Sequence, residues 1–251
     1  MGQNTDSGKQ SLPYELPWPG ELSQGMLPGL IWAGMSFMLL IMNWAYGVFS
    51  LAAMFIFFQT QRNTPVGRAR RHYVRGRLAY RNGNFTEALE QFHQALEIIP
   101  EATAIYPVSA DLYFMLDDIP KAKKLYQQYF QRKAEDHQMR IWYAGQLMER
   151  GLFAEAAREL KKLPAGQRKD KQVVNVLAVC LLKTNHAPEA LQILEPAVKQ
   201  GGSDEQQLSA LYLLAKAYIQ TGEKRKARSI LQKLEQEQPG FEDVSQLLQT
   251  L

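Results

Sequence analysis

The chain has 251 residues and a net charge of +4, and its apolar content is ordinary for a folded protein. A single cysteine, Cys180, excludes an internal disulfide framework and any zinc site built from several cysteines. The charges are unevenly distributed, because none lies between Leu22 and Gln61 whereas the remainder is richly charged. This distribution predicts one apolar segment attached to one charged, folded domain.

The apolar segment runs from Met26 to Phe58 and follows a polar, proline-bearing N-terminal stretch. A helix needs about 20 apolar residues to cross a bilayer core of roughly 30 Å, so we predict a transmembrane segment at residues 26–61. The segment differs from a cleavable signal peptide, which begins with a basic region and a shorter apolar core. We therefore divide the chain into residues 1–25, the transmembrane segment and a helical domain over residues 62–251.

Two models describe the apolar segment. One is a single helix from about Gly34 to Phe58, with Trp18 and Trp32 at the membrane–water interface. The other is a short hairpin that turns near residues 43–47. Asn43 fits both models, as a turn residue or as a polar contact to another helix. Length favours the single crossing, because two crossings and a turn need about 40 residues.

A cluster of arginines follows the apolar segment, and no acidic residue interrupts it before Glu87. Its members are Arg62, Arg68, Arg70, Arg71, Arg75, Arg77 and Arg81. Such a cluster can bind nucleic acid, but beside a membrane segment it is typical of cytoplasmic flanks and anionic lipid contacts. We therefore expect Arg62, Arg68, Arg70 and Arg71 to flank the membrane, the following domain to be cytoplasmic, and nucleic acid not to be a partner. The N-terminus lies outside in the single-helix model and inside in the hairpin model.

The rest of the chain repeats itself. One alanine recurs at intervals of 34, 34, 34 and 37 residues: Ala88, Ala122, Ala156, Ala190 and Ala227. A second series of small residues has the same spacing: Gly76, Ala110, Ala144, Ala178 and Ala215. Each unit contains two apolar-periodic stretches of helical length, joined at a Gly, Asn or Asp turn. The small residues are expected where the paired helices cross, and units of this kind must stack to bury their apolar faces.

The pattern resembles the tetratricopeptide-repeat family over about residues 69–241. The first unit carries the clearest match, with Gly76, Gly83-Asn84-Phe85, Ala88, Phe92, Ala95 and Pro100. The resemblance implies an all-α fold, a right-handed α-solenoid of about five helix pairs. We place the repeats at 69–102, 103–136, 137–170, 171–204 and 208–241, with three extra residues near Gly201 and a capping helix at 242–251. The complete fold prediction is an N-terminal transmembrane helix, or short hairpin, followed by this solenoid.

In the family, the first helix of each unit lines a groove that binds an extended peptide or a helix. Projected onto this chain, that pattern predicts a groove formed by Tyr73, Arg77, Tyr80, Asp111, Phe114, Ile141, Met148, Asn175, Val179, Tyr212 and Lys216. Aromatic anchors beside isolated charges suit peptide capture, although some of these residues can equally pack between repeats. The lysine–asparagine clamp of chaperone-binding members is not present. Its positions hold Tyr73, Arg77, Val108, Gln138 and Trp142, of which only Arg77 is suited to the role.

No catalytic motif is evident in the sequence. The four histidines lack the i, i+4 partner of a helical metal site, and no nucleophile elbow, phosphate loop or dinucleotide motif is present. Cys180 lies in an apolar helical pattern, which favours packing over reactivity. We therefore expect a protein without enzymatic activity, cofactor or metal.

The resemblance implies a scaffold for protein–protein interactions, similar to bacterial inner-membrane members that serve polysaccharide export, pilus assembly or secretion. Its partners would be proteins, mainly integral membrane proteins. Two alternatives remain: a receptor that captures a peptide of a soluble client, and an accessory subunit of a membrane enzyme.

Overall fold

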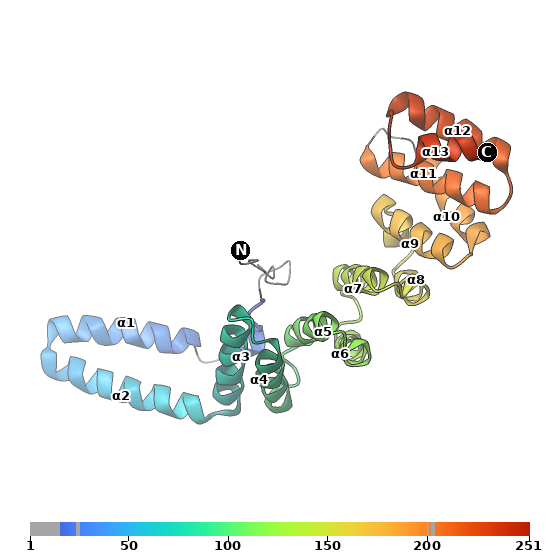
Figure 1. The fold of residues 1–251 in the computed structure, drawn as a ribbon. Coiled ribbons are helices and arrows are strands. Elements are labelled where there is room, and N and C mark those ends of the chain that lie inside the picture. Colours follow the sequence, from blue (N-terminus) through green and yellow to red (C-terminus); the bar gives the residue numbers. More distant parts are fainter. Residues whose placement is uncertain (1–15, 24–25, 200, 202–203) are drawn as a thin grey trace, which may run out of the picture. The chain divides into compact units, whose positions relative to one another are not determined.

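The computed structural model describes residues 16–23, 26–199, 201 and 204–251. These residues form thirteen α-helices and two short 3-10 helices and contain no strand, which confirms the all-α class for them (Figure 1). The chain divides into two compact units, residues 1–135 and 136–251. The predicted N-terminal stretch, residues 1–25, lies largely outside the described residues.

The apolar segment forms a hairpin of two helices, α1 (Met26–Met42) and α2 (Trp44–Asn63), which lie side by side (Figure 1). Asn43 between them has an extended backbone, and its Oδ1 accepts a hydrogen bond from the Ala45 amide at 3.1 Å. A side-chain cap of this kind begins a new helix. The predicted single helix from about Gly34 to Phe58 is therefore wrong, because this cap interrupts it. Within the described part of the chain, no helix combines the length and apolarity needed to span a membrane.

The two hairpin helices meet through small and polar side chains. At Gly47 an added Cβ would lie 2.3 Å from the Leu40 Cα, so the backbones approach too closely for any larger residue. The hydroxyl oxygens of Ser36 and Ser50 lie 2.6 Å apart, and the indole nitrogen of Trp32 donates to Ser50 at 3.3 Å. The side chains of Trp32, Ser36 and Ser50 thus satisfy one another inside the hairpin. Trp32, predicted at a membrane interface, belongs to this helix–helix contact.

The hairpin continues directly into the first repeat helix, α3 (Pro65–Arg81). Thr64 caps α3, since its hydroxyl accepts a hydrogen bond from the Gly67 amide at 3.0 Å. Pro65 occupies the first helical turn, where a missing N–H costs nothing. A Cβ at Gly67 would lie 2.1 Å from the Gln61 carbonyl oxygen. The sharp turn from α2 into α3 therefore depends on glycine at this position.

Five helix pairs follow the hairpin, and the second helix of each pair contains one alanine of the first small-residue series. They are α3 with α4 (Phe85–Ile98), α5 (Ile105–Met115) with α6 (Ile119–Arg132), α7 (His137–Glu149) with α8 (Phe153–Lys161), α9 (Lys171–Lys183) with α10 (Ala187–Lys199), and α11 (Glu205–Gln220) with α12 (Lys224–Glu237). The 3-10 helix η2 (Gln167–Lys169) precedes α9. The final helix, α13 (Val244–Thr250), packs on the last pair through the fully buried Val244. Of the predicted three-residue insertion, Gly201 is described and residues 202–203 lie outside the described residues.

Each pair turns at one residue with a left-handed backbone. These residues are Gly83, Asp117, Gly151, Asn185 and Gly222, with φ between 60° and 84°. Glycine adopts this region freely, and Asn and Asp tolerate it through local hydrogen bonding. The Gly, Asn and Asp turns expected from the sequence are therefore confirmed by backbone geometry.

The two series of small residues are fully buried where the paired helices cross. The alanines of the first series, at 88, 122, 156, 190 and 227, are all 0% exposed, as are those at 110, 144, 178 and 215. In the first repeat the second series has Gly76 instead, and an added Cβ there would lie 2.6 Å from the Phe92 ring. Larger side chains at these crossings would push the helices apart.

Candidate partner-binding groove

Three predicted groove residues lie on α3, in the first unit. Tyr73 is 1% exposed, whereas Arg77 and Tyr80 are half-buried. The Tyr73 ring packs against Phe92 of α4 with centroids 5.7 Å apart. Burial raises the pKa of the Tyr73 hydroxyl to about 12, and the neighbouring Arg77 guanidinium partly offsets this effect. Tyr73 is therefore an uncharged, apolar floor at this point of the predicted groove.

The chain's own N-terminal segment, defined here as Leu16–Ser23, covers this floor. The rings of Trp18 and Tyr73 meet edge-on at 5.4 Å, and the Arg77 guanidinium lies 5.9 Å from the Trp18 ring. The Tyr73 hydroxyl donates to the Pro17 carbonyl. Leu22, in the 3-10 helix η1 (Gly20–Ser23), is fully buried. The structure thus places Trp18, predicted at a membrane interface, on the first repeat.

One of the arginines predicted to flank the membrane takes part in this contact. The Nε of Arg70 donates to the Leu22 carbonyl at 2.8 Å, and burial lowers the pKa of the Arg70 guanidinium. Arg71 donates to the Arg62 carbonyl near the end of α2, and Arg68 is exposed. The side chains of Arg70 and Arg71 therefore brace the junction of hairpin and repeat, whereas Arg62 contributes its backbone carbonyl.

The two predicted groove residues of α5 serve packing within their pair. Asp111 is 2% exposed and accepts a hydrogen bond from the Tyr126 hydroxyl of α6 at 2.5 Å. Phe114 is 3% exposed, and its ring lies 6.1 Å from the ring of Tyr126. Both side chains hold α5 to α6 within the second repeat.

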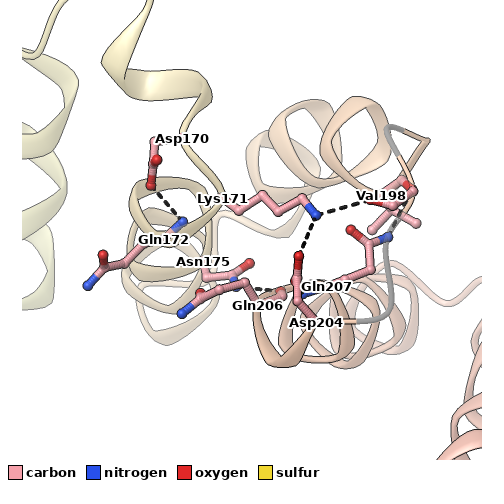
Figure 2. Close-up of polar contacts among 9 residues, drawn as sticks. Asp170, Lys171, Gln172, Asn175, Val198, Asp204, Gln206 and Gln207 are labelled. Carbon is pink, nitrogen blue, oxygen red and sulfur yellow. Dashed lines mark hydrogen bonds and ion pairs between the residues drawn. The ribbon is translucent and has the colours of Figure 1, made fainter.

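In the second unit, Ile141, Met148 and Val179 are half-buried on α7 and α9. Asn175 is 7% exposed and links α9 to α11. Its side-chain amide donates to the backbone carbonyl of Gln206 at 2.9 Å and to the Gln206 side-chain oxygen at 3.2 Å (Figure 2). The predicted groove position at Asn175 is thus engaged in holding consecutive repeats together.

A polar network around Asn175 fixes the start of α11, as Figure 2 shows. The Lys171 ammonium donates to the Gly201 carbonyl at 3.0 Å and to the Asp204 carboxylate at 3.1 Å. Asp204 caps α11 by accepting the Gln207 amide at 2.7 Å, and this bond and Lys171 lower the pKa of the carboxyl. The Gln207 side chain donates to the Val198 carbonyl at 3.0 Å. These bonds anchor the turn at the predicted insertion to the neighbouring repeat.

The last predicted groove residues, Tyr212 and Lys216 on α11, face the C-terminal segment. The Tyr212 hydroxyl donates to the Asp243 carboxylate at 2.6 Å, and Lys216 donates to the Tyr212 hydroxyl at 2.9 Å. Burial, followed by the bond to Asp243, raises the pKa of Tyr212. The ring of Phe241 contacts Tyr212 edge-on at 6.0 Å. The C-terminal cap therefore covers this part of the predicted groove.

The sequence did not indicate a cavity of about 490 Å³ between α4, α5 and α6. Its lining includes Leu96, Tyr106, Ser109 and Lys124, and among the described residues the buried Ser109 hydroxyl has no hydrogen-bond partner. The N-terminal contact was also missed, although its signal was present in Pro17-Trp18-Pro19. A residue that precedes proline is restricted to extended conformations. An extended backbone that carries an aromatic side chain is a form in which peptides bind to grooves.

Comparisons with known proteins agree with the repeat architecture. Family profiles of the tetratricopeptide repeat match residues 69–102, 147–211 and 181–251, more than half of the chain. Among curated proteins, none matches the chain in sequence.

Solved structures are also similar to the chain, and two of them are described here. YrrB, described as a TPR protein with an unusual peptide-binding site, is 18% identical over 72% of this chain and 91% of its own, with a TM-score of 0.56. A putative kinesin light chain with nearly identical TPR-like repeats, from Podosopora anserina, is 21% identical over 70% of this chain and 97% of its own, with a TM-score of 0.50. At these identities the likeness concerns the fold alone. The profile matches, the five helix pairs and their buried small residues together show that the chain belongs to the tetratricopeptide-repeat family.

Proposed function

We propose that this protein is a non-enzymatic scaffold whose α1–α2 hairpin is held in a lipid membrane and whose repeats bind protein partners. The observation that carries the proposal is the outer surface of the hairpin. Twelve large apolar side chains on it are more than half exposed: Ile31, Met35, Phe37, Met38, Ile41, Met42, Trp44, Tyr46, Val48, Phe49, Phe55 and Ile56. A surface this apolar needs a nonaqueous environment, and a lipid bilayer supplies one on all sides of a hairpin.

Both ends of the hairpin adjoin α3, which defines how it would enter the membrane. The N-terminal segment packs on α3, and α2 runs into α3 at Thr64. At a rise of about 1.5 Å per residue, α1 is roughly 25 Å long. We propose that the hairpin inserts from one face with Asn43 deepest, so that the N-terminal segment and the repeats stay on the same side. The arginines of α3 would then lie near anionic headgroups at the cytoplasmic face.

Partner binding is supported by family membership and by the half-buried side chains on the first helices of the repeats. The description of YrrB includes a peptide-binding site, and that protein shares the fold of this chain. We propose that the groove takes an extended peptide or a helix from a protein of a membrane complex, such as a bacterial inner-membrane export, pilus or secretion assembly. There are two alternatives: a receptor that captures a peptide of a soluble client, and an accessory subunit of a membrane enzyme.

Vesicle flotation tests the membrane part of the proposal. The full chain, reconstituted with vesicles that contain phosphatidylglycerol, is expected to float with the lipid. The double variant Phe49→Asp/Ile56→Asp places two charges on the exposed face of α2 and is expected to abolish flotation, since each charge costs about 2–3 kcal/mol in a bilayer interior. Leu116→Asp, an exposed position elsewhere in the same unit, is the control and should float normally. A wild-type chain that stays with the aqueous fraction contradicts the proposal.

A labelling experiment tests the proposed topology. Ser23→Cys and Thr250→Cys are introduced together into a Cys180→Ser background and treated, in sealed vesicles, with a membrane-impermeant maleimide. A hairpin that enters and leaves through one face gives molecules labelled at both cysteines or at neither. Molecules labelled at one cysteine only would instead show a single crossing.

Purification in mild detergent, with crosslinking, separates the three kinds of partner. Integral membrane partners support the scaffold, a soluble client alone supports the receptor alternative, and a catalytic membrane subunit supports the accessory role.

A further inference from the structure

The N-terminal segment, Leu16–Ser23, lies on α3 as a bound peptide would. Its residues before and after Trp18 are prolines, and the first four residues have no regular secondary structure. Proline restricts the preceding residue to extended conformations, so both Leu16 and Trp18 are held in a form that loses little entropy on docking. The segment thus combines a rigid extended backbone with one large aromatic anchor.

The contacts of the segment fall on the residues assigned to the groove. Trp18 meets Tyr73 edge-on and lies within 5.9 Å of the Arg77 guanidinium. Both Tyr73 and Arg77 were predicted as partner-binding positions from the family pattern. The backbone of the segment is also engaged, since the Pro17 carbonyl accepts from Tyr73 and the Leu22 carbonyl accepts from Arg70. Side-chain groups of α3 therefore bind main-chain carbonyls, a mode that any extended peptide can use.

Apolar burial completes the contact. Leu22 is 0% exposed, Leu16 is 9% exposed, and Tyr73, which contacts Trp18, is 1% exposed. Trp18 itself remains 38% exposed, so its ring covers Tyr73 without being enclosed. The segment shields one section of the groove and leaves the anchor within reach of a competing ligand.

We propose that the N-terminal segment is a built-in ligand of the first-repeat section of the groove, and that partners binding there must displace it. The partner chemistry follows from the segment: an extended peptide that presents an aromatic side chain flanked by prolines and a leucine four residues further on. This inference rests on the proposed partner-binding function. It adds which peptides the first repeat would bind and how that binding would be regulated. Because only two residues separate the segment from α1 in the sequence, the hairpin keeps it close to the groove.

The tether makes the competition strong. Short tethers give effective concentrations of about 1 mM. If the free segment binds with a dissociation constant of about 100 µM, the groove is open about one tenth of the time, and an external peptide binds about tenfold more weakly than to an open groove. Releasing the segment should therefore strengthen external binding by about that factor.

The test measures the affinity of the full chain, in mild detergent, for a fluorescein-labelled octapeptide with the sequence of residues 16–23. Binding is detected by fluorescence anisotropy. Trp18→Ala/Leu22→Ala removes the two anchors of the tethered segment and is expected to bind the octapeptide at least about tenfold more tightly than the wild type. Equal affinities for the two proteins overturn the proposal, as does absence of binding to the variant. Loss of thermal stability in the variant without a gain in peptide affinity also overturns it, since the segment would then serve only as a cap on the first repeat.

Two controls define the site. An octapeptide with alanine in place of tryptophan should not compete, and Arg77→Ala in the anchor-free chain should weaken binding of the normal octapeptide. An unchanged affinity in the Arg77 variant would overturn the assignment of the site to α3. A negative result in the peptide-binding test is distinguishable from failure of the proposed function. Vesicle flotation and crosslinking of partners do not require the N-terminal segment to occupy the groove.

Discussion

Trp18 and Tyr73 meet edge-on, with ring centroids 5.4 Å apart and ring planes at 82°. The whole apolar hairpin lies between these two residues in the sequence, so their contact brings both of its ends to α3. The same contact removes Tyr73 from solvent and fixes the position of the N-terminal segment.

The first prediction concerns the titration of Tyr73, whose folded-state pKa is about 12 because of burial. In the unfolded chain a tyrosine titrates near 10. The stabilisation from this difference is fully present below pH 10 and is lost as the pH rises towards 12, since ionisation then favours the unfolded state. A difference titration of tyrosinate absorbance between wild type and Tyr73→Phe should show the late ionisation.

The substitution Trp18→Ala should lower the pKa of Tyr73 towards 10, because removal of the indole ring exposes the Tyr73 side chain to water. Tyr218, with a folded-state pKa of about 12 from burial and its bond to Glu195, is the internal control and should not respond. A Tyr73 that already titrates near 10 in the wild type would contradict the contact.

The second prediction compares two helical glycines. At Gly76 an added Cβ would lie 2.6 Å from the Phe92 ring, whereas at Gly145 of α7 it would meet nothing within 4 Å. Gly76→Ala should lower the free energy of unfolding by about 1 kcal/mol, because overpacking outweighs the gain in helix propensity. Gly145→Ala should raise it by about 0.5–1 kcal/mol. Urea unfolding monitored by circular dichroism measures both, and similar effects at the two sites would disprove the close crossing of α3 and α4.

The third prediction concerns two ion pairs of the second unit. Arg140 on α7 lies 2.8 Å from Glu159 on α8, with side chains only 9% and 16% exposed. Glu159→Gln removes the carboxylate that pairs with the buried Arg140, and that also pairs with the exposed Lys162 at 2.6 Å, and should cost about 2–3 kcal/mol of stability, mostly through the buried pair.

The pair of Lys161 and Glu189, 2.6 Å apart and almost half exposed, is the matched comparison. Glu189→Gln should cost less than about 1 kcal/mol, because water screens the exposed pair. Denaturation midpoints at low and high salt check both variants. If the two substitutions cost the same, burial is not what distinguishes the pairs.

The fourth prediction concerns Cys180, which is 0% exposed in α9 and whose pKa burial raises to about 11. The thiolate is the reactive form, so the native thiol should not react measurably with a disulfide reagent at pH 8, and it should react stoichiometrically in denaturant. Rapid modification of the folded protein would contradict the burial of this residue.

Much of the fold follows from local sequence. The spacing of Ala88 and its equivalents, together with a turn residue in each unit, locates all five helix pairs, because only small residues fit where paired helices cross. The groove was harder to predict. Asn175 and Tyr212 occupy family groove positions, yet they bond to Gln206 and Asp243, and no spacing rule identifies the partners of a side chain.

Two features required the folded structure. The apolar run by itself left a single helix and a hairpin open, and its length favoured the single helix, but the cap at Asn43 and the close contact of Gly47 with Leu40 show the hairpin. The composition of residues 16–23 indicated only a proline-rich flank with a tryptophan suited to an interface. Its place on Tyr73 depends on the hairpin returning the chain to α3. Periodicity determines the repeats because their contacts are local and recur, whereas the contact of Trp18 with Tyr73 is nonlocal and occurs once, so only the folded chain specifies it.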